Sequence, residues 1–210
     1  MAKRTAIYVD GFNLYHSLLK GNDCVKWLDL KALSGALLNR SNEIALIRYF
    51  TARVSNTPSD QNLALRQDVY LRALKAHIPE LTIQIGQFKT EKKIKPVVSP
   101  PPSFIEIWHR EEKGSDVNLA VHLLNDAWHD RYDVALVISN DSDLAEALHL
   151  VQSLGKPVGV ATRFDRPTSQ LRQNSDFQRR ITNTHLTKSQ MPEKIKDSTG
   201  LVISRPAEWR

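Results

Sequence analysis

Cysteine is nearly absent from the chain, which holds one thiol, Cys24, among 210 residues. A single cysteine excludes an internal disulfide and a cysteine-rich zinc site. Because disulfides are typical of oxidising compartments, this composition indicates a reducing, cytoplasmic setting. The seven histidines show no spacing typical of metal ligands, so a histidine-centred metal site is not expected.

Long apolar runs are also missing. No stretch approaches the length of about 20 residues that a membrane-spanning helix needs, so no membrane partner is expected. The opening residues Met-Ala-Lys-Arg-Thr lead straight into a predicted strand, without an apolar signal segment. Neither a Walker phosphate loop nor a dinucleotide-binding glycine motif is present, which argues against nucleotide-cofactor chemistry.

Negative charge is in deficit, with 23 Asp and Glu against 29 Lys and Arg, a net charge of +6 and a pI of about 9.5. Residues 178–210 hold seven of the basic and three of the acidic residues, and so carry +4 of that charge. A polyanionic partner is one interpretation of this excess. A basic surface without a specific partner explains the charge equally well.

The strongest structural signal is the segment Val134–Asp143, in which five apolar residues run directly into Ser139, Asn140 and Asp141. An unbroken apolar run of this length predicts a strand buried on both faces, as in a parallel sheet covered by helices. Asp143 is expected to begin an amphipathic helix. Asp141 and Asp143 then lie at the carboxyl end of a central strand, the edge where open α/β sheets bind ligands.

Strands and helices alternate along the rest of the chain. Strands are predicted over 5–10, 43–54, 81–86, 158–161 and 176–181, and helices over 28–38, 61–77, 117–128 and 168–173. This alternation predicts an α/β fold with a central, mainly parallel sheet and helices on both faces.

Two segments are expected to lie outside that sheet. Residues 89–108 predict a flap, a basic and proline-stiffened excursion from which residues 104–108 return as a short strand. Residues 183–210 are polar and predict a basic tail, in which residues 201–203 can pair with a strand edge. The domain itself is expected to span residues 1–182. The basic residues of the flap are Lys89, Lys92, Lys93 and Lys95, and its prolines are Pro96 and Pro100–Pro102.

Three acidic residues are expected to converge. Asp10 ends the first strand, Asp141 ends the central strand, and Asp116 begins the helix that leads into the central strand. In right-handed β-α-β units, helix N-termini lie on the same edge of the sheet as strand C-termini. Crowded carboxylates repel one another, and a divalent cation removes that cost. Oxygen ligands favour Mg²⁺ or Mn²⁺, and such a site suits phosphodiester hydrolysis.

Neighbouring polar residues extend this site. Asn13 and Ser139 can hold a carboxylate or a water molecule, and Lys113 can contact phosphate or offset the acidic cluster. Each residue also has a purely structural explanation. Asp116 and Asp143 suit helix N-caps, Asp10 before Gly11 suits a turn, and Lys113 suits a solvated surface. The coincidence of two strand-ending aspartates with one at a helix start favours the functional interpretation.

Three ordered motifs, Tyr8–Tyr15, Lys113–Val117 and Ile138–Leu144, resemble the NYN domain family, a branch of the PIN-like nucleases that includes the LabA-like proteins. The resemblance covers residues 4–182. It implies a PIN-like three-layer α/β/α fold and metal-dependent cleavage of RNA. It further implies that Asp10, Asp116 and Asp141 bind the metal, that Asp143 is auxiliary, and that Asn13 is the polar residue after the first acid.

The chain departs from that family pattern at two positions. Asn140 stands where many relatives have glycine, and Glu43 is the candidate for the acidic residue that PIN nucleases often carry near the second strand. The predicted flap and the predicted tail are not part of the family pattern.

The favoured hypothesis is a Mg²⁺- or Mn²⁺-dependent ribonuclease. One alternative is a non-catalytic RNA-binding or regulatory protein that keeps the acidic residues. A weaker alternative is a phosphatase for small phosphoesters, which the lack of an Asp-x-Asp motif after the first strand disfavours. A homo-oligomer is left open. The residues expected to contact the RNA backbone are Lys89, Lys92, Lys93, Lys95, Arg179 and Arg180.

Overall fold

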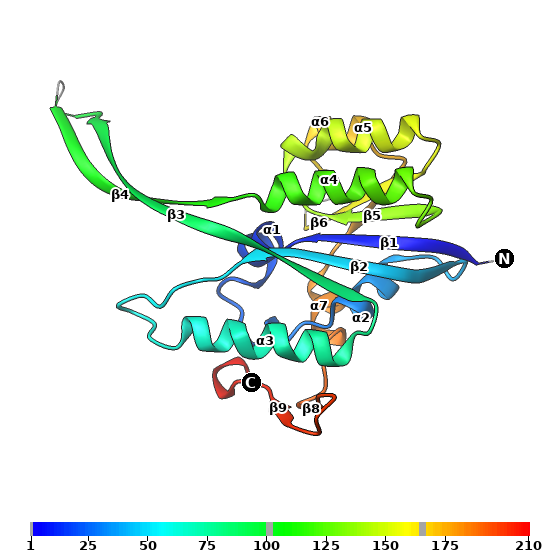
Figure 1. The fold of residues 1–210 in the computed structure, drawn as a ribbon, viewed down its shortest axis with the longest axis horizontal. Coiled ribbons are helices and arrows are strands. Elements are labelled where there is room, and N and C mark those ends of the chain that lie inside the picture. The colour runs from blue at the N-terminus through cyan, green and yellow to red at the C-terminus, as the bar shows by residue number, and fades with distance from the viewer. Residues whose placement is uncertain (1, 100–102, 164–166) are drawn as a thin grey trace.

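The computed structural model describes residues 2–99, 103–163 and 167–210 (Figure 1). A seven-stranded sheet with the order β4-β3-β2-β1-β5-β6-β7 forms its centre. Neighbouring strands are parallel, except for the antiparallel pair β3 and β4, which confirms the predicted mainly parallel sheet. The strands are β1 (Lys3–Asp10), β2 (Asn42–Ala52), β3 (Leu81–Val97), β4 (Ser103–Lys113), β5 (Val134–Ile138), β6 (Val158–Thr162) and β7 (Phe177–Arg180).

Helices cover both faces of the sheet, which confirms the three-layer arrangement (Figure 1). Successive residues of β1 alternate between the two layers. Ile7 and Val9 pack in the core with the first set of helices, and Ala6 and Tyr8 pack in the core with the second set. The first set is α2 (Leu30–Leu37), α3 (Leu63–His77) and α7 (Asn183–Lys188), and the second set is α4 (Ser115–Trp128), α5 (Ala145–Ser153) and α6 (Ser169–Gln173).

The predicted central strand is confirmed, because all five residues of β5 are buried. The helix after it begins later than expected. A 3₁₀ turn over Ser142–Leu144 comes first, and α5 starts at Ala145. None of the helices in the described part of the chain is long and apolar enough to cross a membrane.

The predicted flap is wrong in its secondary structure. Strand β3 continues to Val97, and residues 87–97 pair antiparallel with residues 103–113 of β4. We call these paired segments the ribbon; it projects away from the three layers (Figure 1). The described part of the ribbon has two strands, so each strand has a partner on one side and an open edge on the other. Pro96 is tolerated because proline, which has no N–H to donate, is accepted on edge strands. The proline run at 100–102 lies outside the described residues.

The predicted tail is also wrong, because residues 183–210 are folded onto the core. They form α7, a hairpin of β8 (Lys194–Lys196) and β9 (Val202–Ser204), and a 3₁₀ turn over Ala207–Trp209. Residues 202–203 pair with β8, so the expected pairing of this segment with a strand is present. The indole of Trp209 lies 6.2 Å from the ring of Trp27 and 6.0 Å from that of Tyr70, measured between centroids.

A buried ion pair ties α4 to the sheet. Asp126, which is fully buried, accepts hydrogen bonds at 2.5 Å and 2.9 Å from the guanidinium of Arg48 on β2. The phenol of Tyr8 on β1 donates a third at 2.8 Å, and Arg131 a fourth at 3.2 Å. Burial acts to raise the pKa of Asp126, but the hydrogen bonds from Arg48 and Tyr8 outweigh burial and lower the pKa. The carboxylate is therefore charged and fully paired.

Replacing Arg48→Met leaves the Asp126 charge buried without its main partner, so we expect the free energy of unfolding to fall by about 3–5 kcal/mol. The comparison is Arg53→Met, which removes an exposed pair with Asp68 and is expected to lower it by about 0–1 kcal/mol. Urea denaturation measures both. Because the pKa of Asp126 is lowered by folding, the stabilisation holds above pH ~4 and disappears as the pH falls through the lowered pKa. Equal losses in the two variants would contradict this interpretation.

Candidate metal centre

The three predicted acidic residues lie together at the carboxyl edge of the sheet. Asp10 ends β1, Asp141 follows β5, and these strands are parallel neighbours with Val9 opposite Ile138. Asp116 is the second residue of α4. One carboxylate oxygen from each of the three lies within 4.8 Å of the others. The convergence expected from topology is therefore present in the fold.

Asp10 is buried and fixed by hydrogen bonds. Its Oδ1 accepts from the backbone N–H of Asn13 at 2.9 Å, and its Oδ2 accepts from the hydroxyl of Ser139 at 2.8 Å. Burial raises the pKa of Asp10, and the negative charge of Asp141 adds to the increase, while the two hydrogen bonds oppose it. Asp10 also caps α1 (Gly11–Leu14). The same residue therefore forms the turn after β1 and belongs to the acidic cluster.

Ser139 and Asn13 connect the two strand ends. The hydroxyl of Ser139 donates to Asp10 and accepts from the backbone N–H of Asp141 at 3.1 Å. The side-chain oxygen of Asn13 accepts from the backbone N–H of Asn140 at 3.1 Å. Asn140 in turn accepts from the backbone N–H of Thr168 at 3.2 Å, a bond that a glycine at this position cannot form.

Asp116 projects from the first turn of α4. Gly114 makes the turn from β4, with φ at 100°, a conformation that favours glycine. Gly114 is also the N-cap of this helix, and the first helical residue, Ser115, donates to Glu112 through its backbone N–H and its hydroxyl, at 3.2 Å and 2.8 Å. Asp116 is therefore not needed as a cap. Burial raises the pKa of Asp116 to about 6, reinforced by Asp10 and Asp141 and then by Glu112 and Asp143.

Asp143 is not the cap of the following turn either. Its backbone N–H donates to Asp141 Oδ1 at 3.0 Å, which makes Asp141 the N-cap of the 3₁₀ turn. The carboxylate of Asp143 acts on the cluster through its charge, as its effect on the pKa of Asp116 shows.

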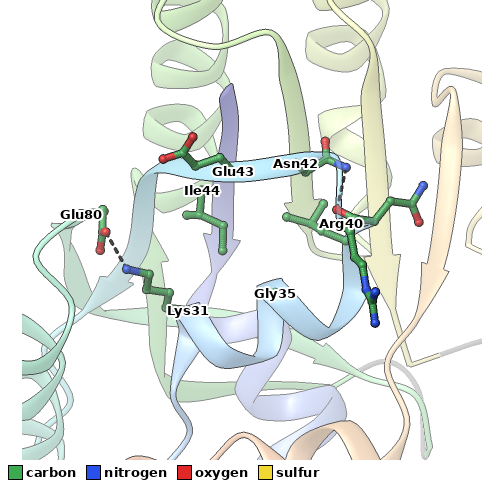
Figure 2. A pocket seen from close by; sticks show the side chains of 9 residues that line it. Lys31, Gly35, Arg40, Asn42, Glu43, Ile44 and Glu80 are labelled. Atoms are coloured by element: carbon green, nitrogen blue, oxygen red, sulfur yellow. Dashed lines mark hydrogen bonds and ion pairs between the residues drawn. The ribbon is translucent and has the colours of Figure 1, made fainter. Parts of the chain in front are cut away.

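Lys113 pairs with a neighbouring glutamate, and Glu43 does not lie near the acidic cluster. The ammonium of Lys113 lies 2.8 Å from Glu111 Oε2, on the ribbon. Glu43 lies near the start of β2 opposite Arg4, whereas Asp10 lies opposite Phe50, so Glu43 is at the other edge of the sheet. Figure 2 shows Glu43 there, above a groove with Lys31 and Glu80. Glu112 is the additional acid beside the cluster; the sequence shows it only as the second glutamate of Glu111-Glu112.

The basic residues proposed for RNA are partly engaged within the protein. Lys89 and Lys93 lie 2.7 Å and 3.0 Å from carboxylate oxygens of Glu91, and Lys92 lies 2.9 Å from Glu106. Lys95 is exposed near the end of β3, and Arg180 is exposed on β7.

Arg179 is a packing residue. Its guanidinium donates to the carbonyl oxygen of Leu37 at 2.9 Å and lies 5.0 Å from the ring centroid of Phe177.

The ribbon exposes aromatic and aliphatic side chains that sequence reasoning missed. Ile94, Phe104 and Trp108 are 71%, 68% and 70% exposed. Residues that lie opposite one another in the ribbon point to the same face, as do residues two apart on one strand. Ile94, Phe104 and Trp108 therefore share a face with Lys92. The ammonium of Lys92 lies 5.4 Å from the Trp108 ring centroid. The alternation of Lys with Ile and aromatic residues was the available signal.

A cavity of about 350 Å³ lies next to the acidic residues, lined from Gly11 and Phe12 through Tyr49 and Tyr70 to Trp209. Its side chains pack with the core of the α2, α3 and α7 layer, and Gly11, which follows Asp10, belongs to its lining. Sequence reasoning missed this cavity, because its wall includes the segment 183–210 that was expected to be a tail.

Comparison with known proteins supports the fold and the family. A crystal structure of a protein of unknown function from Vibrio parahaemolyticus superposes with a TM-score of 0.52 and 18% identity, covering 87% of this chain and 94% of that chain. A curated relative, the 6-hydroxy-3-succinoylpyridine 3-monooxygenase HspA of Pseudomonas putida, is 30% identical over 175 residues. That alignment covers 71% of this chain and 56% of the relative, so the chain spans about half the length of that protein.

The NYN domain family matches residues 4–181, which include all but the first residue of β1, strands β2 to β7, all three aspartates and the ribbon. The three motifs on which the resemblance depended fall within that match. The chain therefore belongs to the NYN domain family.

Proposed function

We propose that the protein is a Mg²⁺- or Mn²⁺-dependent ribonuclease that hydrolyses phosphodiester bonds at Asp10, Asp116 and Asp141. The observation that carries the proposal is the approach of three carboxylates to within 4.8 Å at the carboxyl edge of the sheet. Family membership supports the same activity. The site can be reached by a substrate that arrives from solvent, because Asp116 is exposed while Asp10 is buried.

The donor set fits a hard divalent cation. Aspartate oxygens are the ligands that Mg²⁺ and Mn²⁺ prefer, and three of them converge here. Their mutual repulsion contributes to the raised pKa of Asp10 and of Asp116, and a cation between them relieves it. When bound, such an ion polarises a phosphoryl oxygen and lowers the pKa of a coordinated water molecule.

The protein's own groups hold this arrangement rigid. Ser139 fixes the orientation of Asp10 and the backbone of Asp141 at once, so both carboxylates are set before substrate arrives. Asp143 adds negative charge at the rim, where its carboxylate can accept a hydrogen bond from water. Lys113 can turn from Glu111 to phosphate, because an exposed ion pair contributes only about 0–1 kcal/mol.

The ribbon extends the RNA-binding surface in this proposal. Its Lys–Glu pairs are solvent-exposed and open at small cost, so the lysines can exchange glutamate for phosphate. Phe104 and Trp108 add exposed rings on which bases can stack. Lys95 and Arg180 complete the proposed backbone contacts, and Arg179 is left out because it packs against Leu37. A cytoplasmic location and a homo-oligomer remain predictions.

A second candidate function comes from the curated relative, whose name describes the oxidation of a substituted pyridine. The observation that favours it is the aromatic-lined cavity of about 350 Å³ beside the acidic residues, a size within the range of small-molecule sites.

Replacing Ser139→Ala removes the hydroxyl that bridges Asp10 and Asp141, so we expect Mn²⁺ affinity to fall by about 10- to 100-fold. Calorimetric titration of the full chain with Mn²⁺ measures this. The matched control is Ser153→Ala on α5, whose hydroxyl donates to the carbonyl oxygen of Leu150. An unchanged affinity in the Ser139 variant argues against Ser139 as the support of the metal ligands.

The cleavage proposal is tested by incubating single-stranded and structured RNA with the protein, with and without Mn²⁺. We expect metal-dependent cleavage that falls at least about 100-fold in the Asp10→Asn/Asp141→Asn variant, because the cation loses two of its charged ligands. Gel electrophoresis of end-labelled RNA gives the rate. The control is Glu43→Gln, an acid-to-amide change at the opposite edge of the sheet, which is expected to leave the rate unchanged.

RNA binding by the inactive double variant, measured at two salt concentrations, separates the enzyme from a non-catalytic RNA-binding protein. Cleavage by the wild type together with binding by the variant supports the enzyme. Binding without metal-dependent cleavage by either protein establishes the non-catalytic alternative and overturns the nuclease.

The second candidate is tested with 6-hydroxy-3-succinoylpyridine itself. If this chain shares the relative's reaction, chromatography will show consumption of the pyridine in aerated buffer containing a nicotinamide or flavin reductant. Substrate that is unchanged after prolonged incubation, with purified relative as the positive control, removes this candidate.

A further inference from the structure

The cavity beside the acidic residues is walled by aromatic rings from five separate parts of the chain. They are Phe12 and Tyr15 after β1, Tyr49 on β2, Tyr70 on α3, Phe88 at the base of the ribbon, and Trp209 near residue 210. A volume of about 350 Å³ holds a small ligand rather than a few water molecules. A wall assembled from such distant segments is a feature of the whole fold.

The rings contact one another in two groups. At the mouth, Phe12 meets Phe88 edge to face, with 5.5 Å between their centroids. Deeper in the wall, the rings of Tyr70 and Trp209 are 6.0 Å apart. Tyr15 begins a π-helix over Tyr15–Leu19, a rare conformation that is frequent at functional sites.

Three polar groups of the lining are already paired within the protein. The side-chain amide of Gln67 bonds to the backbone of Val54 and Ala52, both at 2.9 Å. Lys26 pairs with Asp23 at 2.6 Å, and the phenol of Tyr70 donates to the carbonyl oxygen of Leu28 at 2.9 Å. Six aromatic rings also line the cavity, and stacking is how a ring face recognises a planar heteroaromatic group.

The cavity and the metal centre are joined through the backbone at the end of β1. Gly11, next to Asp10, lines the cavity, and a Cβ there would lie 2.6 Å from the carbonyl oxygen of Phe50 and 2.8 Å from the ring of Tyr49. Only glycine permits this close approach. Burial raises the pKa of Tyr49 to about 12, and the charge of Asp10 adds to it, so the carboxylate and the cavity wall are electrostatic neighbours.

We propose that this cavity binds one planar heteroaromatic ring. We further propose, on the basis of the ribonuclease proposed above, that in an RNA substrate this ring is the base of a nucleotide next to the bond at the aspartates. Asp10, Gly11 and Phe12 are consecutive, with Cα atoms ~3.8 Å apart, so the cavity lining begins one residue after the first aspartate of the cluster.

The test measures binding of AMP, UMP and pyridine-3-carboxylate to the full chain in the presence of a metal chelator. Saturation-transfer NMR detects contact with the ring protons of each probe in the wild type, and calorimetry gives the affinity. We expect Tyr15→Leu and Phe88→Leu each to weaken binding about tenfold or more, the effect of losing one stacking ring. Trp128→Leu, which removes an exposed ring on α4, is the matched control and is expected to bind as the wild type does.

The outcomes separate the two parts of the proposal. Nucleotide binding that weakens in both variants supports the ring site and its role for a base. Binding of the pyridine alone supports the ring site and overturns the base assignment. No saturation transfer to any probe, or equal affinity in the wild type and both variants, overturns the proposal. These binding measurements contain a metal chelator and do not depend on RNA cleavage. A failure of cleavage contradicts the ribonuclease proposal and leaves the binding results unaffected.

Discussion

The ion pair of Arg48 with Asp126 is the interaction on which the rest of the structure depends. It joins α4 to β2, and the Tyr8 phenol joins the same carboxylate to β1, so helix and sheet are fixed through one buried group. Asp126 lies near the end of α4, and Asp116 lies at its start. With the helix axis fixed, Asp116 meets the ends of β1 and β5. A buried pair stabilises little by itself, but it specifies this one docking of the helix.

The acidic residues at the sheet edge destabilise the fold rather than stabilise it. Burial and neighbouring charges raise the pKa of both Asp10 and Asp116, so each carboxylate is less favourable as an anion here than in water. Ser139 and the backbone of Asn13 offset part of this through hydrogen bonds to Asp10. The edge thus combines rigid support with uncompensated negative charge, which is the condition in which a cation binds strongly. The rest of the core must supply the stability that this edge lacks.

The sequence was sufficient for the sheet and for the aspartates, because β5 is an unbroken apolar run and the rule for β-α-β units places strand ends and helix starts at one edge. It was insufficient where the signal came from single residues. Asp126 on an amphipathic helix looks like a surface acid, and only the tertiary fold brings Arg48 to it. In residues 183–210 the buried Leu186, Ile195 and Trp209 are scattered among polar neighbours, so no periodic pattern forms. Lysines and prolines likewise concealed the ribbon strands.

Strand β3 runs without a break from the main sheet into the ribbon, and this continuity has a mechanical consequence. Residues 81–86 pair with β2, whereas residues 87–97 extend about 35 Å and, in the described part of the chain, pair with β4 alone. Phe88 lies just past the residues paired with β2 and touches Phe12. The base of the ribbon therefore touches the cavity wall, two residues from Asp10. Any load that bends the far end of the ribbon is transmitted as torque to that wall.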